Sequence, residues 1–145
     1  MRPEADAQLE KRPMAGTFKF ELVSPEKVLM SADAEQVMLP AVEGDMTVFA
    51  QHAPVVVTLR PGVLDIGHAG SKSRIFVRSG FAEIVPDRVT VLAEKAFDMA
   101  DVDAAHIASE LKAAEEELAA AGDDEATFMA ARAVEQLRLL SGKAA

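Results

Sequence analysis

The strongest constraint on the fold is a change in sequence pattern near residue 97. Up to that point, short apolar runs alternate with prolines and glycines, whereas the 48 residues from Asp98 onward contain fifteen alanines and no proline. Alanine is the best helix former and proline the worst. The sequence therefore predicts a β domain over residues 17–97 and an α-helical domain over residues 98–145.

The β domain is predicted from apolar residues that recur with a period of two. Phe18, Phe20 and Leu22 alternate with charged residues, as in a strand with one buried face. Further apolar runs bounded by turn residues lie at 37–39, 46–49, 55–59, 63–66, 75–77, 82–85 and 89–93. Strands at this spacing predict a sandwich or barrel. The three valines at 55–57 do not alternate with polar residues, so we expect them to be covered on both faces.

Two helices are predicted in the second part. Asp98 or Asp101 can cap the first helix, and Asp123 or Asp124 the second, with Gly122 as the C′ residue between them. Apolar residues at helical spacing form one stripe on each helix: Ile107, Leu111, Ala114, Leu118 and Ala121, then Ala126, Ala130, Ala133, Leu137 and Leu140. These features predict an antiparallel two-helix hairpin.

The composition of the hairpin predicts a weak core. Its stripes consist largely of alanine, which buries few methylene groups, and each buried methylene contributes about 0.8 kcal/mol. Residues 98–145 also contain 11 acidic and 4 basic residues, a net charge of −7 out of −9 for the chain. We interpret the triplet Glu115, Glu116 and Glu117 as a solvated helical face. The hairpin is therefore expected to be the mobile part of the molecule.

Composition and motifs argue against several functions. The net charge of −9 disfavours nucleic-acid binding, the chain has no cysteine, and no apolar run approaches the roughly 20 residues of a transmembrane helix. His52 is interpreted as a loop histidine that bonds the backbone, although Glu43 or Asp45 could in principle partner it in acid–base chemistry. No metal-ligand spacing or phosphate-binding loop is present, so an enzyme is not expected.

The first sixteen residues are predicted to be a disordered tail. They balance three acidic against three basic residues and lack the apolar stretch of a secretory signal. The native start can be either Met1 or Met14.

Five motifs, in this order and spacing, resemble the ε (epsilon) subunit of bacterial and chloroplast F-type ATP synthase, which is related to the mitochondrial δ subunit. They are VSPEK at 23–27, VMLP at 37–40 leading to EGD at 43–45, HAP at 52–54, LRPG at 59–62 and VTVLAE at 89–94. The resemblance spans residues 18–140. It implies a ten-stranded β-sandwich of two five-stranded sheets, followed by the helical hairpin.

The resemblance also implies a function. Such a subunit is non-catalytic, binds the γ (gamma) subunit and the c-ring of the central stalk, and couples proton-driven rotation to ATP synthesis. It meets the α and β subunits transiently, binds no nucleic acid, and reaches the cytoplasmic side of the inner membrane only through the complex. No cofactor is expected.

Individual residues can be matched to the family pattern. Glu43, Gly44 and Asp45 match the turn that faces the c-ring, whereas His52 and Phe81 match positions that contact γ or shape its loop. The first residue of the Arg78-Ser79-Gly80 segment stands where relatives often carry serine in Ser-Gly-Gly.

The regulatory pattern matches less well. In some relatives the hairpin binds ATP, and the corresponding positions here are Asp103, His106, Arg132 and Arg138. His106 replaces an arginine of that pattern, and neutral histidine is a poorer phosphate ligand than arginine. ATP binding by the hairpin is therefore doubtful, and the few basic residues of the hairpin predict weak inhibition of ATP hydrolysis.

Two other functions stay open. One is an ATP sensor in which the hairpin closes on the nucleotide, although Arg132 and Arg138, six residues apart, are expected on different helix faces. The other is an adaptor that has a helical docking arm but no rotary partner.

Overall fold

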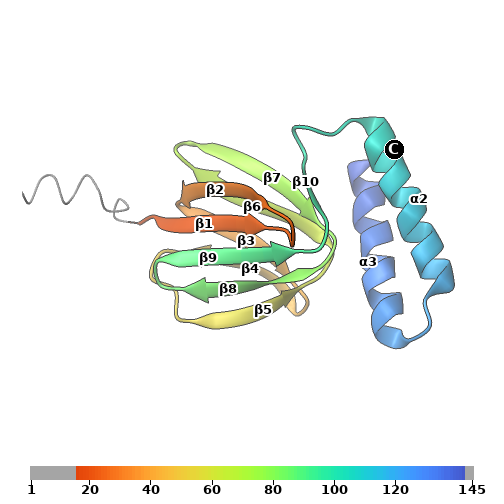
Figure 1. Ribbon diagram of the computed structural model, residues 1–145, viewed down its shortest axis with the longest axis horizontal. Coiled ribbons are helices and arrows are strands. Elements are labelled where there is room, and N and C mark those ends of the chain that lie inside the picture. The colour runs from red at the N-terminus through yellow and green to blue at the C-terminus, as the bar shows by residue number, and fades with distance from the viewer. Residues whose placement is uncertain (1–15, 143–145) are drawn as a thin grey trace, which may run out of the picture.

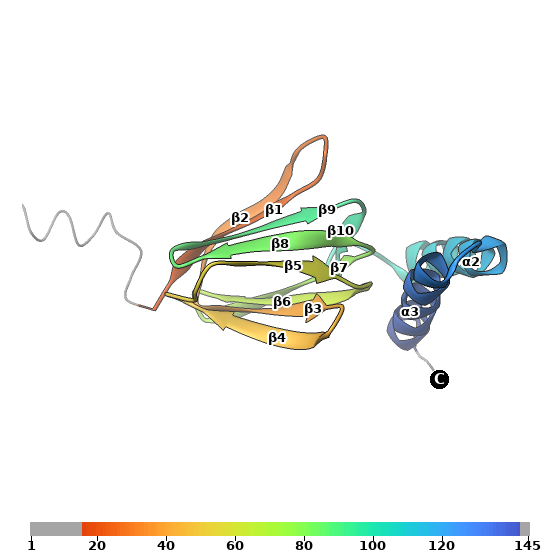
Figure 2. The ribbon, with the colours of Figure 1, turned by 90° about the horizontal axis from the view of Figure 1, so that it is seen from below.

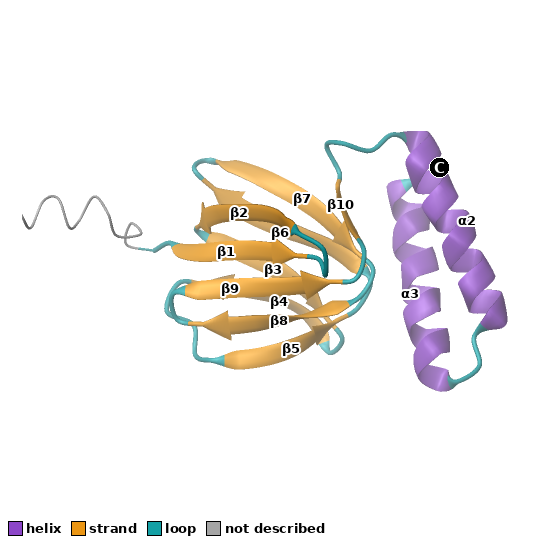
Figure 3. Ribbon diagram, viewed as in Figure 1, coloured by secondary structure: helices purple, strands orange, loops and turns teal. Residues whose placement is uncertain are grey.

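The computed structural model describes residues 16–142, which form a β-sandwich with two helices side by side at one end (Figures 1 and 3). The predicted disordered tail, apart from Gly16, lies outside the described residues. The strands are β1 Phe18–Val23, β2 Val28–Ala34, β3 Gln36–Ala41, β4 Gly44–Phe49, β5 Val55–Leu59, β6 Gly62–His68, β7 Ser71–Val77, β8 Gly80–Val85, β9 Arg88–Ala93 and β10 Ala96–Asp98. The helices are α2 Ala104–Ala120 and α3 Asp124–Leu140.

The strands form two layers of five. Their order is β10-β7-β6-β3-β5-β8-β9-β1-β2, with β4 paired to the other edge of β3. The layers join only where Ala41 of β3 pairs with Leu59 of β5, so the path folds into β10, β7, β6, β3 and β4 on one side and β5, β8, β9, β1 and β2 on the other (Figure 2). This confirms the predicted sandwich followed by helices.

The interior of the sandwich is filled by large apolar side chains. Phe18, Phe20 and Leu22 alternate along β1 and are all buried, as their spacing predicted. They pack with residues from both layers, including Leu39 and Ile84. Close packing of this kind makes an interior that deforms little.

Two strands were not found from the apolar runs. β2 has an exposed or half-buried residue at every position except Ala34, and β10 is only three residues long. They are the two ends of the strand path. Edge strands bury less apolar surface than central strands, so their sequences carry a weaker periodic signal.

The prediction that the valines at 55–57 are covered on both faces is wrong. Val56 is 65% exposed and Val55 is 38% exposed, whereas Val57 is half-buried and packs against the core. β5 lies in a layer whose inner face meets the core and whose outer face is covered by no other element among residues 16–142 (Figure 2). An apolar run can therefore be half-exposed.

The first helix begins later than either predicted cap. Asp103 is the N-cap and accepts a hydrogen bond from the His106 backbone N–H at 2.9 Å. Asp98 instead ends β10, and its carboxylate accepts the Ala100 N–H at 2.9 Å. Neither Asp98 nor Asp101 caps the helix, because strand pairing and the following turn occupy these residues.

The second helix is capped by one of the two residues that the sequence predicted. Asp123 caps it by accepting the Ala126 N–H at 2.7 Å. Gly122 follows the C-cap of α2, but it does not adopt the left-handed conformation of a typical C′ glycine.

The hairpin has its own small core, to which the sandwich contributes. Ala114 and Ala133 are fully buried, so the two helices approach closely, and Ile107, Val134 and Leu137 lie around them. Val134 was missing from the predicted stripe, and Ala126, which was included, is exposed.

Two phenylalanines connect this core to the sandwich. Phe76 of β7 is completely buried in the hairpin cluster, and its ring stacks on Phe97 of β10 with centroids 5.1 Å apart. Phe97 in turn meets the His106 ring edge-on at 4.8 Å. The sandwich thus supplies both phenylalanine rings of this small core.

Candidate functional site

The predicted site residues lie in four separate regions. Glu43 lies in the turn between β3 and β4, and Gly44 and Asp45 are the first two residues of β4, at the end of the sandwich that faces the helices (Figure 2). His52 lies in the loop between β4 and β5, at the opposite end. Phe81 lies in β8 of the sandwich, and the remaining candidates lie on or just before the two helices.

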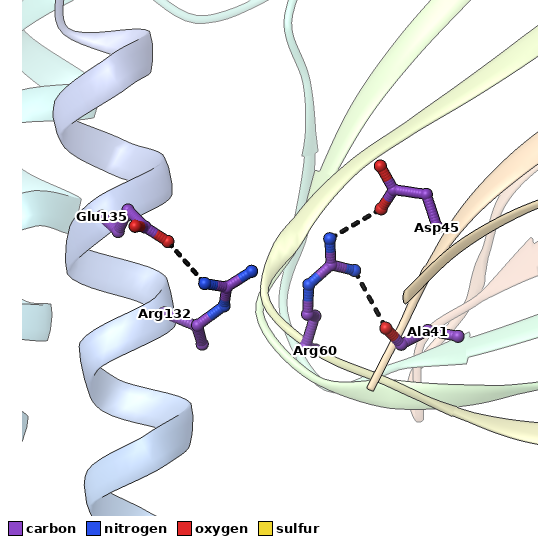
Figure 4. A network of polar contacts seen from close by, with 5 residues as sticks. All are labelled: Ala41, Asp45, Arg60, Arg132 and Glu135. Atoms are coloured by element: carbon purple, nitrogen blue, oxygen red, sulfur yellow. Dashed lines mark hydrogen bonds and ion pairs between the residues drawn. The ribbon is translucent and has the colours of Figure 1, made fainter. Parts of the chain in front are cut away.

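The acidic turn is fixed by an arginine that the sequence analysis did not include among the site residues. The Arg60 Nη2 atom lies 2.6 Å from the Asp45 Oδ1, and its Nη1 donates to the Ala41 carbonyl at 3.0 Å (Figure 4). Gly44 has a φ of +139°, a backbone conformation in which a residue with a side chain would be strained. The turn therefore presents Asp45 in a defined orientation.

Arg60 comes from the LRPG motif, which the sequence analysis used only to support the family resemblance. Its side chain is mostly buried, whereas that of Asp45 is 58% exposed. The pairing of β3 with both β4 and β5 brings the two residues together across fifteen positions of the chain. Only strand register could have revealed this contact. Both residues also line a groove with Leu139 and Leu140 of α3.

The two predicted γ-contact residues lie at opposite ends of the sandwich. His52 Nδ1 lies 2.8 Å from the carbonyl oxygen of Ala53, which agrees with its interpretation as a histidine that bonds the backbone of its loop. Phe81 is the second residue of β8, near the helical end (Figure 1), and is 47% exposed. No single small contact patch contains both side chains.

Phe81 belongs to an apolar row on the outer face of its layer. In the strand register Phe81 lies opposite Thr58 of β5 and Leu92 of β9, and Leu92 lies opposite Val23 of β1. Val56, which is diagonal to Phe81, is 65% exposed, and Leu92 is 39% exposed. We call Val23, Val56, Phe81 and Leu92 the outer apolar row. An exposed apolar cluster of this kind is typical of an interaction surface.

The predicted nucleotide residues do not form a common site. Asp103 and His106 are joined only through the N-cap hydrogen bond of α2. Arg132 Nη1 donates to Glu135 on its own helix at 2.8 Å (Figure 4), and Arg138 Nη2 donates to Glu115 of α2 at 3.1 Å. Both arginines are thus paired with carboxylates of the hairpin.

Potential metal-ligating side chains are not clustered in the described residues. Across residues 16–142, no group of three or more His, Asp or Glu side chains is placed to hold a metal ion. His68 lies 2.9 Å from the hydroxyl of Ser73 through its Nε2, in a hairpin of the sandwich. None of the helices in this part of the chain is both long enough and apolar enough to cross a bilayer.

Known proteins resemble this chain both in sequence and in fold. Residues 17–99 match the family model of the ATP synthase delta/epsilon chain, β-sandwich domain. The ATP synthase epsilon chain of Mesorhizobium japonicum is 48% identical over 130 residues, covering 89% of this chain and 96% of the relative. That of Rhodospirillum rubrum is 43% identical, covering 83% and 90%.

Solved structures share the fold. A chain in the mitochondrial ATP synthase of Euglena gracilis (OSCP/F1/c-ring) matches with a TM-score of 0.68 at 20% identity, covering 90% of this chain and 82% of that one. A chain in the central stalk/c-ring structure of the Tetrahymena thermophila enzyme matches with a TM-score of 0.61 at 13% identity, covering 86% and 96%. On the evidence of the family model and the close relatives, the chain belongs to the ATP synthase delta/epsilon family, among its epsilon chains.

Proposed function

We propose that this chain is a non-catalytic subunit of the central stalk that joins the γ subunit to the c-ring and so couples proton-driven rotation to ATP synthesis. The observation that carries the proposal is identity of 48% to an epsilon chain over nearly the whole length of both proteins. A sandwich with a close-packed interior suits a part that transmits torque, because such an interior resists deformation.

The outer apolar row is the proposed contact with γ. An exposed apolar side chain gains about 25 cal/mol for each Å² that a partner removes from water. Val56, Phe81 and Leu92 lie on adjacent strands of one layer, so a single partner surface can cover all three. This position also accounts for the three consecutive valines of β5, one of which points out of the sandwich.

The turn at residues 43–45 is the proposed contact with the c-ring. Its exposed carboxylates can pair with basic side chains in polar loops, an interaction that is short-ranged and weak for each pair. Arg60 restrains Asp45, which reduces the conformational freedom that is lost on binding. Through these contacts the subunit would lie on the cytoplasmic side of the inner membrane, peripheral to it.

The regulatory role proposed for the hairpin is small. Inhibition of hydrolysis in the family is helped by basic residues, and here Arg132 and Arg138 are already paired with Glu135 and Glu115. The same pairs argue against the ATP-sensor alternative. Contacts with α and β subunits would be transient.

Binding to γ is tested with matched phenylalanine variants. Phe81→Asp lies in the outer apolar row, whereas Phe128→Asp lies on α3 with a similar exposure, 44% against 47%. Calorimetric titration of each full-length variant with a γ subunit should show a loss of affinity for Phe81→Asp only, of at least about tenfold. Equal affinities for both variants would rule out this face as the γ contact, and the absence of any γ binding by the unmodified chain would favour the adaptor alternative.

Coupling and regulation are tested in the reconstituted enzyme. In vesicles, Glu43→Lys should lower proton-driven ATP synthesis while leaving ATP hydrolysis by the detached F1 part unchanged.

The hairpin is tested with a chain that ends at Ala100. This truncation keeps β10 and tests the predicted division between the two domains. It should change the rate of ATP hydrolysis by less than about twofold, because screened surface charges contribute little. A large rise in hydrolysis would show that the hairpin inhibits through apolar contacts.

A further inference from the structure

The hairpin meets the sandwich through a cluster of ion pairs that the sequence analysis did not identify. Arg78, directly after β7, lies 2.5 Å from Glu117 through its Nη2 and 3.9 Å from Glu110 through its Nη1. Lys95, between β9 and β10, lies 3.5 Å from Glu110. We call Arg78, Lys95, Glu110 and Glu117 the docking cluster.

The docking cluster crosses between the two structural parts. Its cations come from the sandwich and its anions from α2, whereas Arg132–Glu135 and Arg138–Glu115 lie within the hairpin and Arg60–Asp45 within the sandwich. Every ion pair between the sandwich and the helices in residues 16–142 involves Arg78 or Lys95. The cluster is therefore the electrostatic connection between the two parts of the described chain.

Burial makes the central pair more effective than an ordinary surface pair. The side chains of Arg78 and Glu110 are only 11% and 13% exposed. Glu110 Oε1 receives no hydrogen bond, so it depends on the charges of Arg78 and Lys95. His106 of the same helix lies 4.0 Å from the other carboxylate oxygen, Oε2, through its Nε2. Removing Arg78 and Lys95 would take away the two permanent cations beside a mostly buried carboxylate, which is strongly unfavourable.

The negative charge of the whole hairpin adds to its attraction to the two cations of the docking cluster. Residues 98–145 have a net charge of −7, and the sandwich meets them with Arg78 and Lys95 at the end of its strands. The contact also has an apolar part, in which Phe76 and Phe97 of the sandwich pack with Ile107, Val134 and Leu137 of the helices. Electrostatic attraction thus supplements this apolar contact.

We propose that Arg78, assisted by Lys95, is an electrostatic latch that holds the acidic hairpin against the end of the sandwich. Arg78 contacts Glu110 and Glu117, which are seven residues apart on one face of α2, so that one guanidinium fixes two turns of the helix. The latch sets the balance between docked and undocked hairpin. That balance depends on ionic strength through Lys95 and Glu117, whose side chains are 54% and 56% exposed. This inference concerns the chain by itself and does not depend on the proposed coupling function.

The test measures the position of the hairpin in the full chain. The protein contains no cysteine, so spin labels can be placed at Thr47→Cys on β4 and Ser109→Cys on α2, two exposed neutral positions. Pulsed electron-spin resonance then gives the distribution of distances between sandwich and hairpin. Far-UV circular dichroism of each variant verifies that strands and helices are retained.

Charge reversal at one residue should release the hairpin. Arg78→Glu should raise the ratio of undocked to docked molecules at least about tenfold, because it replaces two attractions by two repulsions. Arg88→Glu is the matched control, since it makes the same charge change at the start of β9, at the far end of the sandwich (Figure 1). Glu117→Gln, at a position whose side chain is 56% exposed, should give a smaller shift in the same direction.

Rescue and salt complete the test. Arg78→Glu combined with Glu117→Arg should restore much of the docked population, and about 1 M KCl, where the screening length is about 3 Å, should shift the unmodified chain toward the undocked form. The proposal is overturned if Arg78→Glu and Arg88→Glu give the same distribution. It is also overturned if neither Glu117→Gln nor salt moves the hairpin while the chain stays folded.

Discussion

The sandwich and the hairpin are stabilised by different kinds of side chain. The sandwich buries Phe18, Phe20 and many branched residues completely, whereas the two helices meet each other through Ala114 and Ala133. Large side chains bury more apolar area per residue than alanine does. The sandwich can therefore be stable by itself, and the hairpin depends on what the sandwich supplies. This difference suits a molecule with one rigid part and one part that can detach.

The largest expected effect is on the core of the sandwich. Phe20→Ala should destabilise the chain by about 3–5 kcal/mol, through lost burial and the cavity left behind. Because the hairpin packs on strands of the sandwich, both parts should unfold in one transition at lower urea concentration, as measured by far-UV circular dichroism. Helices that survive after the strands unfold would show that the hairpin does not need the sandwich.

A truncation of Phe76 should separate the two parts. This residue belongs to β7 but is buried against the helices, so Phe76→Ala should lower the stability of the hairpin by about 3 kcal/mol. Hydrogen exchange should accelerate in α2 and α3 while β1 and β9 keep their protection. Equal acceleration in all strands would contradict the division of the core into two clusters.

The N-cap of α2 should have a smaller effect. Asp103→Ala removes the acceptor of the His106 N–H and should cost about 1 kcal/mol. Asp101→Ala changes the same residue type two positions earlier and should be nearly neutral. Thermal unfolding followed at 222 nm distinguishes the two variants. An equal loss of stability in both would indicate that Asp101, which the sequence pattern also allowed as the cap, contributes as much as Asp103.

The smallest expected effect is at the acidic turn. Asp45→Asn weakens the pair with Arg60, and since Asp45 is 58% exposed the loss should be about 0.5 kcal/mol or less. Urea unfolding should barely change. A loss of several kcal/mol would mean that the pair stabilises the sandwich instead of orienting a contact residue.

Sequence patterns predicted the central strands and the helices because these elements bury one face regularly. Phe18, Phe20 and Leu22 show the period of a strand, and Ile107 and Ala114 that of a helix. The edge strands β2 and β10 were not predicted from the apolar runs because they bury little apolar surface. The cap of α2 was misplaced because Asp98, Asp101 and Asp103 are equivalent in sequence, and only the end of β10 decides between them.

Local periodicity and motifs in a fixed order were enough to predict the two-part organisation, most residues of the sandwich core and the family resemblance. Which charges meet could be learned only from the folded chain. Arg60 reaches Asp45, and Arg78 reaches Glu117 from 39 positions away. It also decided that Val56 faces outward. Such contacts depend on strand register and on how the hairpin docks, and neither is encoded in the spacing of residues along the chain.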